Sequence, residues 1–277
     1  MLIYDKYFSP VNVDLPITLF GSGSKGNSCF IEPARLLIDL GLTRDIYQNH
    51  FKQVDRIALT HIHGDHLNLA TLKHVLRTYP HIQFILPPTL LEKVDPLWEE
   101  LEKRTTLLTP KESFYYDTRE HIRVFITPYR TKHGDLKNVA YDVNLPYFNT
   151  RLMYATDLEE INANIFEETD GLPDELYNLI LLEANYDQDK LHQILEGYYE
   201  EERLYGSNKA LTNLIFRAKS NFRHLSEQEA GSYVAKHLTP GGLFIPLHAS
   251  ETFGTYIQHY RAKAKAKGFS EKGGINP

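Results

Sequence analysis

Short apolar runs alternate along the chain with stretches in which apolar residues recur at helical spacing. Strands are expected over 17–20, 29–32, 35–41, 56–60, 81–86, 106–108, 113–116, 122–127, 138–143, 152–157, 177–183 and 243–248. Helices are expected over 45–53, 67–78, 89–102 and 190–238. The four runs between residues 106 and 145 are typical of a meander. This pattern predicts an α/β protein.

The densest polar motif follows the apolar run 56–60. It reads Thr60-His61-Ile62-His63-Gly64-Asp65-His66. In a nearly extended backbone, alternation would send His61, His63 and Asp65 to the same side. Helical spacing begins at Leu67, so His66 would open a helix. Imidazole and carboxylate groups at this density favour a divalent metal ion such as zinc over a chance cluster of surface histidines.

Other expected strands also end in polar residues. Asp39, Asp157, Glu183 and His248 each close an apolar run, and a shared site at one edge would explain this repetition. Asp39 is expected to hold a ligand histidine or fix a turn rather than to bind metal. His133 lies in 128–135, which is expected to be a loop; taken alone, that position favours an exposed turn.

Composition narrows these alternatives. The 277 residues are 42% hydrophobic, enough for a core, and we expect one domain spanning 1–277. The single cysteine, Cys29, excludes an intrachain disulfide, and thirteen histidines favour nitrogen and oxygen ligands. No signal-like or membrane-spanning apolar stretch is evident, so a cytoplasmic protein without membrane contact is expected.

The formal charge of −6 argues against a global electrostatic grip on nucleic acid. One local exception lies between Arg203 and Arg223, where five basic residues occur without an acidic one. A phosphate-contacting surface and a solvated helix face explain this stretch equally well.

The histidine motif resembles the H-x-H-x-D-H signature of the metallo-β-lactamase-fold hydrolases. His63 stands where the flavodiiron oxidoreductase branch carries Glu, which favours hydrolysis over redox chemistry. Further segments resemble the YycJ/WalJ-like group of exonucleases and phosphodiesterases: Gly21 to Ser28, Leu182 to Asp187, Phe222 to Ser226 and Pro246 to Ser250. The resemblance implies a four-layer αββα sandwich, with two facing mixed sheets and helices on both outer faces.

The resemblance also implies residue roles. One metal ion would be held by His61, His63 and His133, a second by Asp65, His66 and His248, with Asp157 bridging the two. The catalytic residues would be Asp65, Asp157 and His224, of which His224 would protonate the leaving alkoxide or steady the non-bridging oxygens. The residues expected to bind substrate are Asn27, Glu183, Asn185 and Arg223. Zn²⁺ is the first expectation for both ions, with Mn²⁺ and Fe²⁺ as alternatives.

The function expected from this set is a dinuclear hydrolase of phosphodiester bonds, with a metal-bridging hydroxide as nucleophile. Its substrate would be nucleic acid or a nucleotide, as in a DNA or RNA 5′-exonuclease. A cyclic-nucleotide phosphodiesterase and a glyoxalase II-like thioester or lactone hydrolase are the alternatives. A non-catalytic sensor is less favoured, because no ligand is missing. The departures Leu158-Glu159, Arg223 and Glu227 leave the substrate open, and the sequence also leaves a homodimer open.

Overall fold

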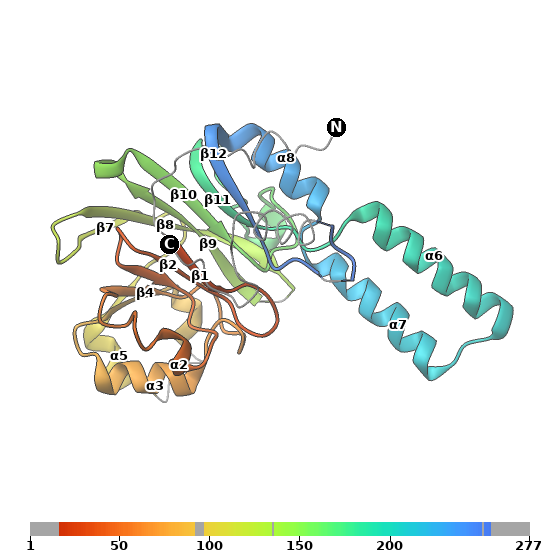
Figure 1. Ribbon diagram of the computed structural model, residues 1–277, viewed down its shortest axis with the longest axis horizontal. Helices are drawn as coiled ribbons and strands as arrows, with labels where there is room; N and C mark the ends of the chain where they lie inside the picture. Colours follow the sequence, from red (N-terminus) through yellow and green to blue (C-terminus); the bar gives the residue numbers. More distant parts are fainter. Residues whose placement is uncertain (1–16, 92–96, 135, 251, 256–277) are drawn as a thin grey trace.

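The computed structural model describes residues 17–91, 97–134, 136–250 and 252–255, which form two facing six-stranded sheets (Figure 1). The first sheet contains, in spatial order, β1 (Ile17–Gly21), β2 (Ser28–Ile31), β3 (Leu36–Ile38), β4 (Arg56–Ala58), β5 (Gln83–Leu86) and β6 (Thr105–Leu107). The second contains β12 (Leu238–Leu247), β11 (Tyr177–Glu183), β10 (Thr150–Ala155), β9 (Leu136–Leu145), β8 (Arg123–His133) and β7 (Phe114–Asp117). The predicted fold class is confirmed.

Both sheets are mixed in the same way. The strands from β1 to β3 and from β7 to β10 pair antiparallel, whereas those from β3 to β6 and from β10 to β12 pair parallel. Parallel neighbours end at the same edge of a sheet. The segments that follow β3 and β4 therefore leave from one edge of the first sheet, and those that follow β10, β11 and β12 leave from one edge of the second.

Alternation along each strand divides the apolar side chains between two layers. On β2, Cys29 and Ile31 pack between the sheets, while Phe30 packs against the outer helices. On β10, Leu152 and Tyr154 face inward in the same manner. Successive side chains of a strand point to opposite faces of the sheet, so a strand that is buried on both faces carries apolar residues at successive positions. Burial also raises the pKa of the Cys29 thiol to about 12, so this thiol is not a reactive group.

Helices cover the outer faces. The first sheet is covered by α2 (Arg44–Tyr47), α3 (Leu69–Thr78) and α5 (Trp98–Leu101), and the second by α8 (Glu227–His237) (Figure 1). Two further helices, α6 (Gln188–Tyr205) and α7 (Lys209–Ser220), extend away from the sandwich. Short 3₁₀ turns are η1 (Pro88–Leu90), η3 (Glu102–Arg104), η4 (Pro146–Phe148), η5 (Ile165–Glu167) and η6 (Asn221–Arg223). No described helix is long and apolar enough to cross a membrane.

Buried tyrosine hydroxyls join the two sheets across the core. Tyr141 on β9 donates to the carbonyl of Leu59, which follows β4, at 2.7 Å. Tyr116 on β7 donates to the carbonyl of Ala34 at 2.9 Å. A buried carbonyl needs a donor, so these bonds fix how one sheet lies on the other.

Several predicted elements differ from the structure. The run 106–108 is not part of a meander, because β6 joins the first sheet parallel to β5. The segment 128–135 is not a loop up to His133, because β8 pairs with β9 at each position from Phe125 to His133. Residue 135 lies outside the described residues. The hairpin pairing of β8 with β9 outweighs the turn-like composition, and the Pro128 carbonyl still accepts a hydrogen bond from Lys111 N at 2.7 Å.

Two expected helices are shorter than predicted. The helix expected over 45–53 is limited to α2, after which the chain continues in turns. The helix expected over 89–102 is represented by η1 and α5, with 92–96 outside the described residues. The region 190–238 contains α6, α7 and α8.

Replacing Tyr141 with Phe should destabilise the protein by about 1–2 kcal/mol, since the Leu59 carbonyl loses its donor. Urea denaturation followed by circular dichroism measures this. Tyr147, which is 80% exposed, provides the matched control, and its change to Phe should alter stability by less than about 0.5 kcal/mol. Equal midpoints for the two variants would contradict the role given to Tyr141.

Candidate metal centre

Four of the expected ligands lie in the turn between β4 and α3. The turn is closed by hydrogen bonds to the His63 carbonyl from His66 N, at 3.0 Å, and Leu67 N, at 2.8 Å. Asn68 then caps α3 by accepting a hydrogen bond from Thr71 N at 3.0 Å. His66 therefore lies in this turn, three residues before α3 begins at Leu69, and does not open the helix as the sequence predicted, because Leu67 bridges to Leu40 instead.

A glycine-rich loop between β1 and β2 supports this turn. Asn27 N donates to the Asp65 carbonyl at 2.6 Å, and Gly41 N donates to the Asn27 carbonyl at 3.2 Å. A Cβ atom on Gly41 would lie 1.7 Å from the Asp65 carbonyl oxygen, so only glycine allows this close approach. On the other side of the site, Ser22 Oγ accepts from His248 N at 2.7 Å. The loop thus contacts the histidine turn, which follows β4 of the first sheet, and His248, which follows β12 of the second.

Three strand-end residues have a left-handed backbone. Asp39, Asp157 and His248 have φ values of 61°, 52° and 51°, and they follow β3, β10 and β12. Residues other than glycine rarely adopt this conformation, and it is often retained at functional sites. All three side chains take part in the contacts of this centre.

Asp157 lies at the middle of the cluster. Its Oδ2 is 2.6 Å from His66 Nε2 and 3.4 Å from His61 Nε2, while Oδ1 is 3.5 Å from His248 Nδ1. The side chain is buried, and Oδ1 has no hydrogen-bond partner. Burial raises the pKa of the Asp157 carboxyl, but the neighbouring histidines, His66 above all, outweigh this effect and hold the pKa well below its usual range.

Among the described residues, the nitrogen and oxygen atoms that could bind metal ions form three compact groups. Three groups each bring their donors within 4.8 Å of one another: His61, His63, His133 and Asp157; Asp65, His66 and Asp157; and Asp157, Glu183, His224 and His248. His61 Nε2 lies 3.1 Å from His63 Nδ1, close to the separation of about 3.3 Å that a tetrahedral site with 2.0–2.1 Å metal–nitrogen bonds would give. The buried Nδ1 of His133 has no partner. The nitrogen and oxygen donors fit divalent metal ions.

The other six predicted ligands gather around Asp157. The first group contains the three histidines expected for one ion, and the second contains Asp65 and His66. His248 is placed with Glu183 and His224 rather than with Asp65 and His66. Its role as a ligand of the second ion therefore stays a prediction.

Asp39 contacts one of the predicted ligand histidines, as expected. Its Oδ2 lies 2.7 Å from His66 Nδ1, and its Oδ1 accepts from Thr60 N at 2.8 Å. Burial lowers the pKa of His66, but Asp39 and Asp157 outweigh this and raise it to about 10. By contrast, burial and the neighbouring His66 lower the pKa of His61 well below its usual value.

The sequence reasoning missed two members of this network. The Thr60 hydroxyl donates to Asp39 and lies 3.0 Å from His61 Nδ1, and the buried Tyr154 hydroxyl is 3.4 Å from Asp39 Oδ2. Thr60 directly precedes the first histidine, a signal that could have suggested its role. Tyr154 carried no comparable signal, because its contact depends on how the sheets face each other.

Three of the four residues expected to bind substrate lie in the interior. Asn27 is 1% exposed, with Nδ2 2.7 Å from His66 Nε2 and 3.2 Å from Asp65 Oδ2. Asn185 Nδ2 donates to the His248 carbonyl at 2.6 Å. Glu183 is fully buried. These contacts favour holding the ligands over the predicted contact with substrate.

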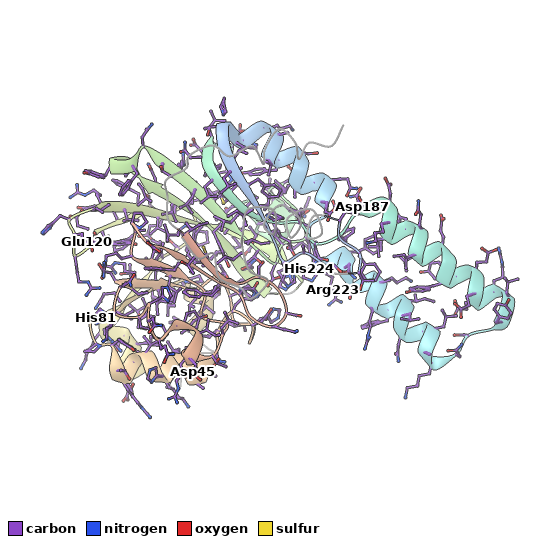
Figure 2. All side chains as sticks on the ribbon, viewed as in Figure 1. Asp45, His81, Glu120, Asp187, Arg223 and His224 are labelled. Atoms are coloured by element: carbon purple, nitrogen blue, oxygen red, sulfur yellow. The ribbon has the colours of Figure 1, made fainter. Side chains whose placement is uncertain are left out.

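Arg223 is exposed and lies next to His224 where the chain returns from α7 (Figure 2). His224 Nδ1 lies 2.7 Å from Glu183 Oε1, and its ring retains some exposure. Glu183 Oε2 accepts from Leu158 N at 2.7 Å, beside Asp157. Burial lowers the pKa of His224, but Glu183 outweighs this and raises it. The structure therefore brings His224 to the same centre as the expected metal ligands.

The chain is similar to a known family and to solved structures. A family profile described as "Beta-lactamase superfamily domain" matches residues 35–207. YhfI from Bacillus subtilis, a metallo-beta-lactamase fold protein, has 16% identity and a TM-score of 0.56, with 92% of each chain covered. The short form of human tRNase Z has 15% identity and a TM-score of 0.53, covering 85% of this chain and 92% of the other.

A third similar structure is Zn²⁺-bound PqqB from Methylobacterium extorquens. It has 13% identity and a TM-score of 0.52, covering 92% of this chain and 96% of the other. No curated protein sequence matches the chain. At these identities the solved structures support the fold alone.

Metal analysis should separate the roles of two carboxylates. After loading with Zn²⁺ and gel filtration, we expect about two ions per chain by elemental analysis. Asp65→Ala should retain about one, whereas Asp157→Ala should weaken both, since Asp157 belongs to every donor group. Asp45→Ala is the matched control, because Asp45 is exposed on α2 away from the centre (Figure 2). Unchanged occupancy in the Asp157 variant would contradict the arrangement.

Proposed function

Because the chain belongs to the beta-lactamase superfamily, whose domain profile matches more than half of it, we propose that it is a dinuclear metal-dependent phosphodiesterase or nuclease. The observation that carries this proposal is the position of the His224–Glu183 pair beside the Asp157 donor groups. A hydrolase of this kind needs ligands and a proton donor close together, and both are supplied by this chain. The finer likeness to the YycJ/WalJ-like group rests on the sequence motifs.

The ligand residues would supply the metal chemistry. Two divalent ions, with Zn²⁺ preferred, would lower the pKa of a bound water and polarise a phosphoryl oxygen. His61, His63, His133 and Asp157 would hold one of them. Asp65, His66 and Asp157 would hold the other, with His248 as the further ligand expected from the sequence. Asp39 would keep the His66 ring in a fixed orientation.

His224 would act as the proton donor. Glu183 accepts from Nδ1 at 2.7 Å, which fixes the ring and leaves Nε2 to carry the transferable proton. Glu183 outweighs the effect of burial and raises the pKa of His224, which favours the protonated ring. The leaving alkoxide would take it as the phosphorus–oxygen bond breaks. Glu183 is thus a positioning residue, because it acts through His224.

Exposed Arg223 supports a phosphate-bearing substrate. It directly precedes His224 and is the one residue of the expected substrate-binding set that lies on the surface. A guanidinium group binds phosphate through paired hydrogen bonds. The net charge of −6 limits this attraction to the local surface. A cyclic nucleotide would satisfy the same contact as a polymer.

A substrate panel would test the reaction class. The metal-loaded protein should cleave bis(p-nitrophenyl) phosphate, and a panel of cyclic nucleotides and labelled single- and double-stranded DNA and RNA would identify the natural class. His61→Ala should abolish turnover, because His61 belongs to the first donor group. Absence of metal-dependent, His61-dependent cleavage across the panel would refute the proposal. A thioester substrate in the same panel would detect glyoxalase II-like activity.

The leaving group tests the role of His224. Substituting His224→Asn should slow cleavage of an unactivated nucleic-acid or nucleotide substrate by about 10²–10⁴-fold. Cleavage of bis(p-nitrophenyl) phosphate should fall by less than about tenfold, since p-nitrophenolate leaves without protonation. His81→Asn is the matched control, because His81 is exposed and lies far from the centre (Figure 2). Equal losses on both substrates would contradict proton donation by His224.

A further inference from the structure

The helices α6 and α7 form a two-helix arm, residues 188–220, which projects from the sandwich (Figure 1). With a rise of 1.5 Å per residue, α6 is about 27 Å long and α7 about 18 Å. The buried apolar contacts of the arm run from its base to the first turn of α7 and include Leu191, Leu195, Leu211 and Ile215. Along the outer part, no residue from Glu196 to Ala210 is buried. The outer arm is therefore packed on itself alone.

Large apolar side chains are exposed along the arm. Tyr205 is 83% exposed, Phe216 73%, Leu204 63%, and Tyr199 and Leu214 are each 41% exposed. Helices in proteins depend on packing of an apolar face for most of their stability. Exposed apolar residues concentrated on one element are typical of an interaction surface.

The two helices carry opposite charge. The outer half of α6 contains Glu196, Glu200, Glu201 and Glu202 against the single cation Arg203. In contrast, α7 contains Lys209, Arg217 and Lys219 and no acidic residue. Within the described part of the chain, Glu200 pairs with Arg203 on its own helix, and no ion pair joins α6 to α7. Lys219 Nζ of α7 instead lies 5.4 Å from the centroid of the Tyr199 ring of α6, and among the described residues the other acidic and basic side chains of the two helices are not paired with each other.

We propose that the arm is the contact between two copies of this chain, in which α6 of each copy packs on α7 of the other. A two-fold axis makes such a contact twice, so one acidic and one basic helix are self-complementary. The product is a four-helix bundle that covers the apolar side chains. Nucleic acid fits this surface less well, because the acidic side chains of α6 would repel phosphates.

Charge reversal provides a specific test by sedimentation velocity on the full metal-loaded chain. The wild type should sediment with twice the 32.1 kDa chain mass. Glu196→Lys with Glu201→Lys reverses α6, and Lys209→Glu with Arg217→Glu reverses α7. Each double variant alone should dimerise at least about 100-fold more weakly, since like charges would face each other. An equimolar mixture of the two should recover the dimer, because opposite charges face again in both contacts.

Apolar contact is tested separately. Phe216→Ser should weaken the dimer, whereas Phe166→Ser is the matched control, because Phe166 is fully exposed on η5 outside the arm. Circular dichroism confirms that each variant is folded. A monomeric wild type, or charge variants that keep its mass, would overturn the proposal. Loss of nucleic-acid binding by the α7 variant at unchanged mass would overturn it in favour of a nucleic-acid surface.

Discussion

The buried carboxylate of Asp157 is the group on which the centre depends. A buried charge is costly unless it is paired, and here the imidazoles of His61, His66 and His248 surround it. The backbone around it is also fixed, since Asn138 Nδ2 donates to the carbonyls of Thr156 and Asp157, each at 2.7 Å. The same imidazoles and carboxylate supply the nitrogen and oxygen donors that a divalent ion requires. The contacts that offset the cost of burying the Asp157 carboxylate are therefore the same contacts that position the predicted metal ligands.

Both sheets must be positioned relative to each other for this centre to form. The histidine turn follows a strand of the first sheet, whereas Asp157 and His248 follow strands of the second. The tyrosine hydrogen bonds through the core and the glycine-rich loop between β1 and β2 limit sliding of one sheet on the other. Core packing thus sets the geometry of the donor groups.

The sequence predicted the parts of the site that depend on local order. The histidine turn carries four donors within six residues, and strands ending in Asp39, Asp157 and His248 were expected to share one edge. It could not place His133 in a strand, because that depends on pairing with β9. Nor could it tell that Asn27 and Glu183 are buried, since their partners come from distant segments. The projection of α6 and α7 had no sequence signal separate from ordinary helical spacing.

The third donor group, around Glu183, is better explained as a hydrogen-bonded pair than as another ion site. Glu183 Oε2 accepts from Leu158 N, and Oε1 lies 2.7 Å from His224 Nδ1 and 3.1 Å from His248 Nδ1. Both Glu183 oxygens already have donors, so an ion there would have to displace them. The carboxylate of Glu183 therefore joins the proposed proton donor His224 to His248, one of the predicted metal ligands.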